Sequence, residues 1–271
     1  MKLDGHAKLT NSAIRAFKTR CSKSTNVFFR EKMCHLPQFS VWNINWSDVS
    51  SNKKDNNFLI KYIIAQELSV FGESSHKIGR GYLTREVVGV DLEPPLVLGH
   101  LFNWGQKYHF MRRASGETVK DAHREAIDLI KKETMNWISS MMNVLHSYRR
   151  HGRSGGSTVF LRKRAASHLA IALHSLQDSF SPGHTKRTHY ENPQYPGAIE
   201  DIYIYKDQDK HNHSQHDFDS GLINSLHARS AVYASADLLR ICALSVSMKS
   251  MFPIGWSMFE NRWLNLSARA N

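Results

Sequence analysis

The chain has few cysteines, and it lacks both a long apolar run and a surplus of acidic side chains. Its 271 residues include only three cysteines, at positions 21, 34 and 242. An odd, sparse set without a C-x-x-C pair is not a disulfide framework and gives no sign of a sulfur-ligated metal. No window approaches the roughly 18 apolar residues that mark a membrane-spanning helix.

A secretory signal is also missing from the first residues, MKLDGHAKLT, which contain no apolar stretch. We therefore expect the chain to be made in the cytoplasm and, if it is exported, to leave by a route that needs no cleaved signal. The composition, 41% hydrophobic and 22% charged, is that of a globular protein. The length is ample for a sizeable core.

Basic residues outnumber acidic ones, 36 to 24, which gives a formal net charge of +12. A surface of this sign favours polyanions, either nucleic acid or anionic lipid headgroups. Much of the excess surrounds the loop HGRSGGS, where the cations are Arg149, Arg150, Arg153, Arg162, Lys163 and Arg164. Two interpretations stay open for this loop: a solvated turn between two helices, or a rim that attracts anions.

Apolar residues recur at helical spacing along most of the chain, and we see no repeat, no low-complexity linker and no convincing strand ladder. Pro182 must end one helix near residue 180. Tryptophans 256 and 263 fall in a terminal segment. The pattern predicts an all-α fold, a single multi-helix domain over residues 1–271 with long loops at 71–118 and 185–217. The expected helices cover residues 6–20, 55–70, 119–149, 157–180 and 218–249.

The chain has 16 histidines, a high count that directs attention to metal binding. In LHSLQDSFSPGHTKR, His174 and Asp178 are four residues apart and share one face of a helix. Pro182 then turns the chain, so that His184 can return to the same point. His168 is excluded, because six residues place it about 120° round the helix from His174.

A second H-x3-D pair lies in HNHSQHDFD, at His213 and Asp217. It falls at the start of the last expected helix, where the same geometry holds. One nitrogen and one oxygen at this spacing can hold a zinc ion. The other interpretation of this stretch is a mobile polar loop.

Two such pairs, the first followed by P-x-H, resemble the zinc-dependent phospholipase C and S1/P1 nuclease superfamily. His6, in GHAKLT, is similar to the histidine near the start of that family's chains. The resemblance runs in family order from His6 to Asp217. It implies an all-α fold around a trinuclear zinc site, with about two to three Zn²⁺ bound per chain.

The family also takes an aspartate and a histidine from a mid-chain loop. The best candidates are Asp91 and His100 in VDLEPPLVLGHLFNW, although the family's spacing there is longer. His109 is the alternative histidine, and Glu93 lies two residues from Asp91.

Members of the family begin with a tryptophan whose free amine and carbonyl bind zinc. Met1 stands five residues before His6, so by resemblance we expect its amine and carbonyl to bind zinc in the same way. Lysine at position 2 is bulky and should prevent removal of the initiator methionine.

The resemblance also implies a role for each ligand. Asp178 would bridge two zinc ions beside His6 and the amine of Met1. One ion would be completed by Asp91, His100 and His174, and a more loosely held one by His184, His213 and Asp217. Asp91 is the expected catalytic residue, orienting or deprotonating the attacking water.

These features together predict a zinc-dependent phosphodiesterase. The preferred substrate is a membrane phospholipid, because HLFNW echoes the phospholipase C branch. A nuclease acting on single-stranded nucleic acid is the alternative, favoured by the charge and by aspartate at 217. A non-catalytic, metal-stabilised binding module is the third hypothesis. An enzyme of either kind would harm its own host, so we expect an exported effector toxin, with an immunity protein or chaperone as partner.

Overall fold

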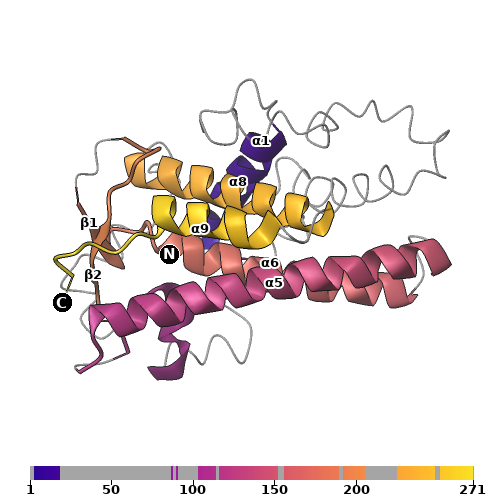
Figure 1. Cartoon of the computed structure of the whole chain (residues 1–271), viewed down its shortest axis with the longest axis horizontal. Coiled ribbons are helices and arrows are strands. Elements are labelled where there is room, and N and C mark those ends of the chain that lie inside the picture. The colour runs from indigo at the N-terminus through magenta and orange to yellow at the C-terminus, as the bar shows by residue number, and fades with distance from the viewer. Residues whose placement is uncertain are drawn as a thin grey trace.

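A computed structural model describes residues 3–18, 87, 90, 103–113, 116–151, 156–188, 192–204, 225–247 and 251–270. Helices make up most of this part of the chain, as the sequence predicts. They pack side by side, with the two termini of the described region on the same side of the molecule as a small sheet (Figure 1).

The longest elements form an antiparallel hairpin. Helix α5 (Val119–His151) runs along one side of the molecule, and α6 (Gly156–Asp178) returns against it (Figure 1). Thr118 caps α5: its Oγ1 accepts the backbone N–H of Asp121 at 3.1 Å and donates to the Asp121 carboxylate at 2.8 Å. Thr118 is thus the N-cap residue, and its hydroxyl satisfies one of the free N–H groups of the first turn.

A second group of helices covers the hairpin. Helix α1 (Leu3–Lys18) packs against α8 (Leu226–Ser247), and α8 packs against α9 (Met251–Trp263). The buried face of α8 is rich in alanine, which lets neighbouring backbones approach closely; Ala228, Ala231, Ala234 and Ala236 are all fully buried. The core thus forms where α1, α6 and α8 meet α5 and α9.

The observed bounds agree with the predicted helices for α1, α5 and α6, and α6 ends at Asp178, four residues before Pro182. The last long helix, α8, begins at Leu226, and residues 218–224, the first part of the helix expected there, lie outside the described residues. The terminal segment contains a helix of its own, α9, in which Pro253 is tolerated because it lies in the first turn. The helix expected over residues 55–70 lies outside the described residues.

The expectation of no strand ladder was wrong. Strand β1 (Thr185–Arg187) pairs antiparallel with β2 (Ile199–Ile202), with Thr185 opposite Ile202. Strands of three and four residues are too short for an alternating pattern to stand out in the sequence. The connection requires Gly197, whose φ is +74° and where a Cβ would overlap the carbonyl oxygen of Thr188.

Among the described residues, no helix combines the length and the apolar composition needed to cross a membrane.

Candidate metal centre

The C-terminal half of α6 is buried on every side, and this places polar side chains inside the core. From Ala172 to Asp178 every residue is buried, and His174 and Asp178 have no exposed surface. A carboxylate is costly to bury unless charged or hydrogen-bonding groups surround it. Here His174 Nε2 lies 3.2 Å from Asp178 Oδ2, the i,i+4 neighbour that the sequence predicts.

Helix α1 brings a second histidine to the same carboxylate. His6 is fully buried, and its Nε2 lies 3.3 Å from Asp178 Oδ1. Its ring stacks on that of His174, with 3.8 Å between the ring centroids. His6, His174 and Asp178 each offer a ligand atom within 4.8 Å of the others, so this buried group could hold a metal ion.

Two further histidines complete the surroundings of Asp178. His109 ends the 3-10 helix η5 (Asn103–His109), and its Nδ1 lies 3.3 Å from Asp178 Oδ2 and 3.2 Å from His174 Nε2. The next residue, Phe110, has a φ of 49°, an uncommon left-handed conformation for a bulky side chain. His184 follows the turn after Pro182, with its Nδ1 3.9 Å from Asp178 Oδ2.

Hydrogen bonds fix the tautomers of three of these histidines. His6 Nδ1 donates to Gln177 Oε1 at 2.8 Å, and His174 Nδ1 donates to the backbone oxygen of Val87 at 3.0 Å. His184 Nδ1 donates to the backbone oxygen of His109 at 2.6 Å. Each partner is an acceptor, so each Nδ1 carries a proton, which leaves Nε2 as the ring nitrogen that can face a metal. Metal-ligating histidines have this arrangement.

Gln177 is oriented in turn by other side chains. Its Nε2 donates to Thr10 Oγ1 at 3.0 Å and to Ser235 Oγ at 3.4 Å, which directs Oε1 toward His6. Three helices, α1, α6 and α8, therefore hold the His6 ring in one orientation.

The electrostatics of Asp178 favour a bound cation. Burial alone would raise the pKa of Asp178, but His184, His174, His6 and His109 together hold that pKa well below its ordinary value. The carboxylate is thus negative and surrounded by imidazole nitrogens. Asp178 Oδ1 and His6 Nε2 are both buried, and neither has a hydrogen-bond partner among the residues that the structure describes. A divalent cation between them would satisfy both atoms, so the residues present fit a metal ion.

The structure therefore brings together four residues predicted from the sequence, His6, His174, Asp178 and His184, and it adds the alternative histidine, His109. The remaining predicted ligands lie outside the described residues: Met1, Asp91, His100, His213 and Asp217, together with Glu93. The chain does reach the cluster four residues before Asp91, at Val87. His168 lies elsewhere, with its Nδ1 2.6 Å from Glu133 Oε2.

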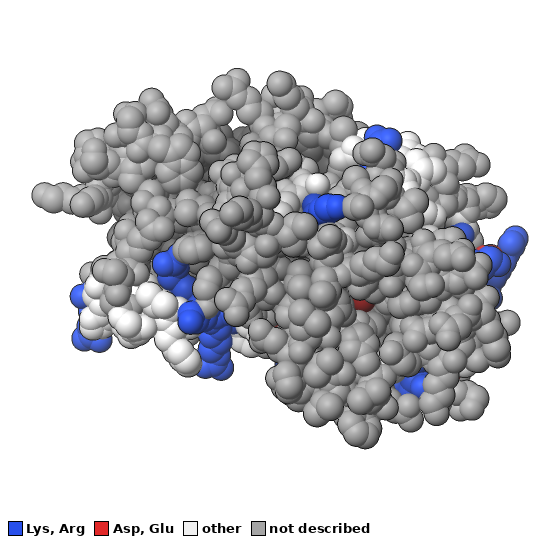
Figure 2. Space-filling model, turned by 180° about the vertical axis from the view of Figure 1, so that it is seen from behind, with Lys and Arg blue, Asp and Glu red and all other residues white. Residues whose placement is uncertain are grey.

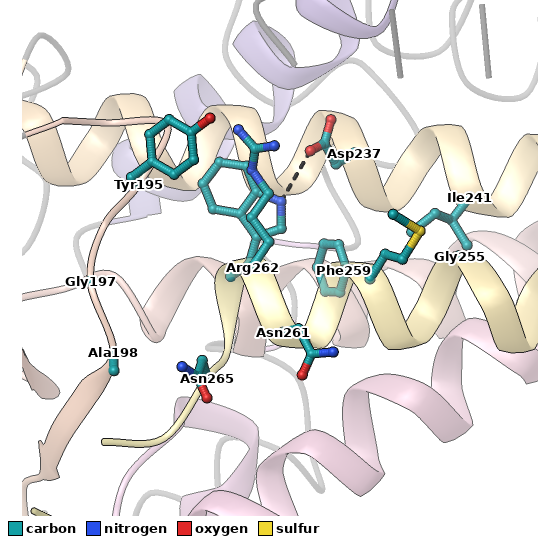
Figure 3. A pocket seen from close by; sticks show the side chains of 12 residues that line it. Tyr195, Gly197, Ala198, Asp237, Ile241, Gly255, Phe259, Asn261, Arg262 and Asn265 are labelled. Carbon is teal, nitrogen blue, oxygen red and sulfur yellow. Dashed lines mark hydrogen bonds between the residues drawn. The ribbon is translucent and has the colours of Figure 1, made fainter. Parts of the chain in front are cut away.

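A separate cavity of about 600 Å³ lies between α8, α9 and residues 195–198 (Figure 3). Its wall includes Asp237, which accepts hydrogen bonds from Trp263 Nε1 at 3.0 Å and Arg240 Nη1 at 2.8 Å. Burial raises the pKa of Asp237, and Arg240 and Arg262 partly offset that effect. None of the residues around Asp178 lines this cavity. The Asp237 carboxylate in its wall already accepts hydrogen bonds from Trp263 and Arg240.

Comparisons with known proteins identify no relative: no family model, no curated protein and no solved structure matches the chain.

Proposed function

We propose that the chain is a zinc-dependent phosphodiesterase, built around Asp178, that hydrolyses membrane phospholipids in the manner of a phospholipase C. The observation that carries this proposal is the pair of facing atoms His6 Nε2 and Asp178 Oδ1, both buried and without a hydrogen-bond partner in the described part of the chain. A structural histidine–aspartate pair would normally share a proton in a well-formed hydrogen bond.

The donor set supports zinc in preference to a hard cation. Imidazole nitrogens and one carboxylate suit zinc, whereas calcium and magnesium prefer oxygen ligands. His6 and His174 would bind through Nε2, since Nδ1 of each is engaged elsewhere. Asp178 can offer two oxygens, one toward each histidine.

A site of about two to three zinc ions needs further ligands, which by resemblance are Met1, Asp91, His100 or His109, His213 and Asp217. The position of His109 beside Asp178 Oδ2 favours it as the mid-chain histidine. Zinc bound in such a site supplies Lewis-acid activation of a phosphoryl group and of water. Asp91 is the residue proposed to accept the proton from that water.

Two other functions each have an observation in their favour. The net charge of +12 favours single-stranded nucleic acid as substrate. The complete burial of His6, His174 and Asp178 favours a closed, structural metal site in a non-catalytic binding module.

One experiment separates the three functions. Zinc content is measured by elemental analysis after zinc loading, and turnover is measured on phosphatidylcholine, phosphatidylethanolamine and single-stranded DNA. We expect more than one equivalent of zinc and hydrolysis of the phospholipids. Hydrolysis of DNA alone would identify the nuclease, and zinc without turnover would identify the binding module.

A matched pair of variants on α6 tests the site itself. His174→Ala should lose zinc and activity, whereas His168→Gln should keep both, because His168 pairs with Glu133 away from Asp178. Less than one equivalent of zinc in the unmodified protein would overturn the proposal.

A further inference from the structure

The end of the α5–α6 hairpin carries exposed apolar side chains. Phe160 is 63% exposed, the largest value for a big apolar residue in the part of the chain that the structure describes, and its neighbour Val159 is 39% exposed. Both lie near the start of α6. Because they are neighbours on one helix, they expose apolar surface at the same place on the protein.

Cations surround these two residues. Arg150, at the end of α5, and Lys163 and Arg164, on α6, are all exposed. Lys163 follows Val159 by four residues and Arg164 follows Phe160 by four, so each apolar side chain has a cation one turn further along. The long stems of lysine and arginine can lie along an apolar surface while their charges reach a polar layer.

Acidic residues are absent from this region of the sequence. Between Glu133 and Asp178 there is no aspartate or glutamate. Figure 2 shows blue side chains gathered where the hairpin ends, with no red among them. The first turn of α6 also has no acidic residue, so no carboxylate of that turn offsets the positive end of the helix dipole.

We propose that this end of the hairpin, defined by Arg150, Val159, Phe160, Lys163 and Arg164 and called here the hairpin tip, docks onto an anionic lipid bilayer. Cations near such a surface are attracted to its headgroups, and apolar side chains enter the boundary between headgroups and acyl chains. Nucleic acid would account for the cations, but not for the exposed Val159 beside Phe160.

The hairpin tip is an attachment surface and not part of the metal centre. Phe160 and His174 are 14 positions apart on α6, which corresponds to about 20 Å along the helix. Docking therefore needs neither bound metal nor turnover, and it can be tested whether or not the proposed phosphodiesterase activity exists.

The test uses vesicles that contain no phosphodiester. Digalactosyl diacylglycerol vesicles, with or without about 30 mol% of the anionic sulfoquinovosyl diacylglycerol, are sedimented with the zinc-loaded protein. We expect binding to the anionic vesicles only. Lys163→Ser/Arg164→Ser should weaken it about 30-fold at low salt, and the loss should shrink at high salt. Phe160→Ser should weaken it about tenfold, with little dependence on salt.

Matched controls lie on other surfaces of the protein. Lys131→Ser/Lys132→Ser removes two exposed cations from α5, and Ile254→Ser removes a 56% exposed apolar side chain from α9. Both controls should bind within about twofold of the unmodified protein. Equal binding to neutral and anionic vesicles, or unchanged binding of Phe160→Ser, would overturn the proposal. If Lys163→Ser/Arg164→Ser lost binding to single-stranded DNA but kept binding to vesicles, the hairpin tip would be a nucleic-acid surface and not a membrane surface.

Discussion

His6 Nε2 and Asp178 Oδ1 lie 3.3 Å apart inside the core, and within the described ranges of the chain neither atom has a hydrogen-bond partner. Nδ1 of His6 donates to Gln177, so Nε2 is the ring nitrogen that faces the carboxylate oxygen. A buried ring nitrogen and a carboxylate oxygen that face one another destabilise the fold unless a proton or a cation lies between them. The stability of the protein should therefore depend on metal.

Asp178→Asn tests this dependence. With zinc at about 100 times its dissociation constant, binding stabilises the folded state by about 2.7 kcal/mol. For a chain of this size that corresponds to a rise of roughly 5–10 °C in the melting temperature, which chelation should reverse. Asp178→Asn should abolish the rise, because the amide loses the charge that attracts the cation. Calorimetry with and without a chelator measures the effect.

The matched control is Asp128→Asn, which changes an exposed aspartate on α5. It should show the same zinc-dependent rise as the unmodified protein. If Asp178→Asn also keeps the rise, the carboxylate is not a ligand.

Gln177 is predicted to position His6 for metal binding. Gln177→Met removes the acceptor for His6 Nδ1–H while keeping a similar side-chain shape. Loss of such a partner typically lowers metal affinity by about 10–100-fold. Gln177→Glu keeps an acceptor at the same place and should restore most of the affinity. Competition with a chromophoric chelator measures the affinities, and equal values for all three proteins would rule out the role.

The sequence predicts the parts of this site that depend on local geometry. His174 and Asp178 meet because any helix brings residues four apart together, and α6 is evident from its apolar pattern. His184 lies in the turn that follows Pro182, near the same carboxylate. The positions of these three residues can be predicted without knowing how the helices pack.

Other parts depend on contacts between distant segments. Gln177 orients His6 only because α1 packs against α6, and the two residues are 171 positions apart. His109 was the alternative to His100, because its contact with Asp178 depends on how η5 packs against α6, which no local pattern in the sequence shows. The short strands β1 and β2 were missed for a similar reason: their pairing depends on contacts between segments, and strands of three and four residues carry no periodicity of their own.

The cap of α5 gives a prediction that is independent of metal. Thr118→Ala removes the acceptor for the backbone N–H of Asp121 and should destabilise the protein by about 1 kcal/mol. Thr118→Ser keeps the hydroxyl and should retain most of the stability. Urea denaturation of the three proteins measures the difference. No difference between the alanine and serine variants would mean that the capping bond contributes nothing to folding.

His123 should make stability depend on pH. Its Nε2 lies 2.6 Å from the backbone oxygen of Leu264 and donates to it, which ties α5 to the C-terminal segment. Burial lowers the pKa of His123 below its ordinary value, although the bond to Leu264 opposes this. In the folded state the ring therefore stays neutral to lower pH than it does in the unfolded chain.

The direction in which stability changes with pH follows from whether the folded or the unfolded state is protonated first. Above about pH 6.5 the ring is neutral in both states, and its contribution to stability is fully present. As the pH falls below that value, the unfolded chain is protonated first, so the contribution is lost as the pH approaches the lowered pKa of the folded state.

His123→Gln keeps a donor for Leu264 but cannot titrate. Between about pH 8 and about pH 5.5, the unmodified protein should lose more unfolding free energy than His123→Gln. Every other titratable group is the same in the two proteins, so this difference isolates His123. Parallel pH profiles for the two proteins would show that the pKa of His123 is not lowered in the folded state.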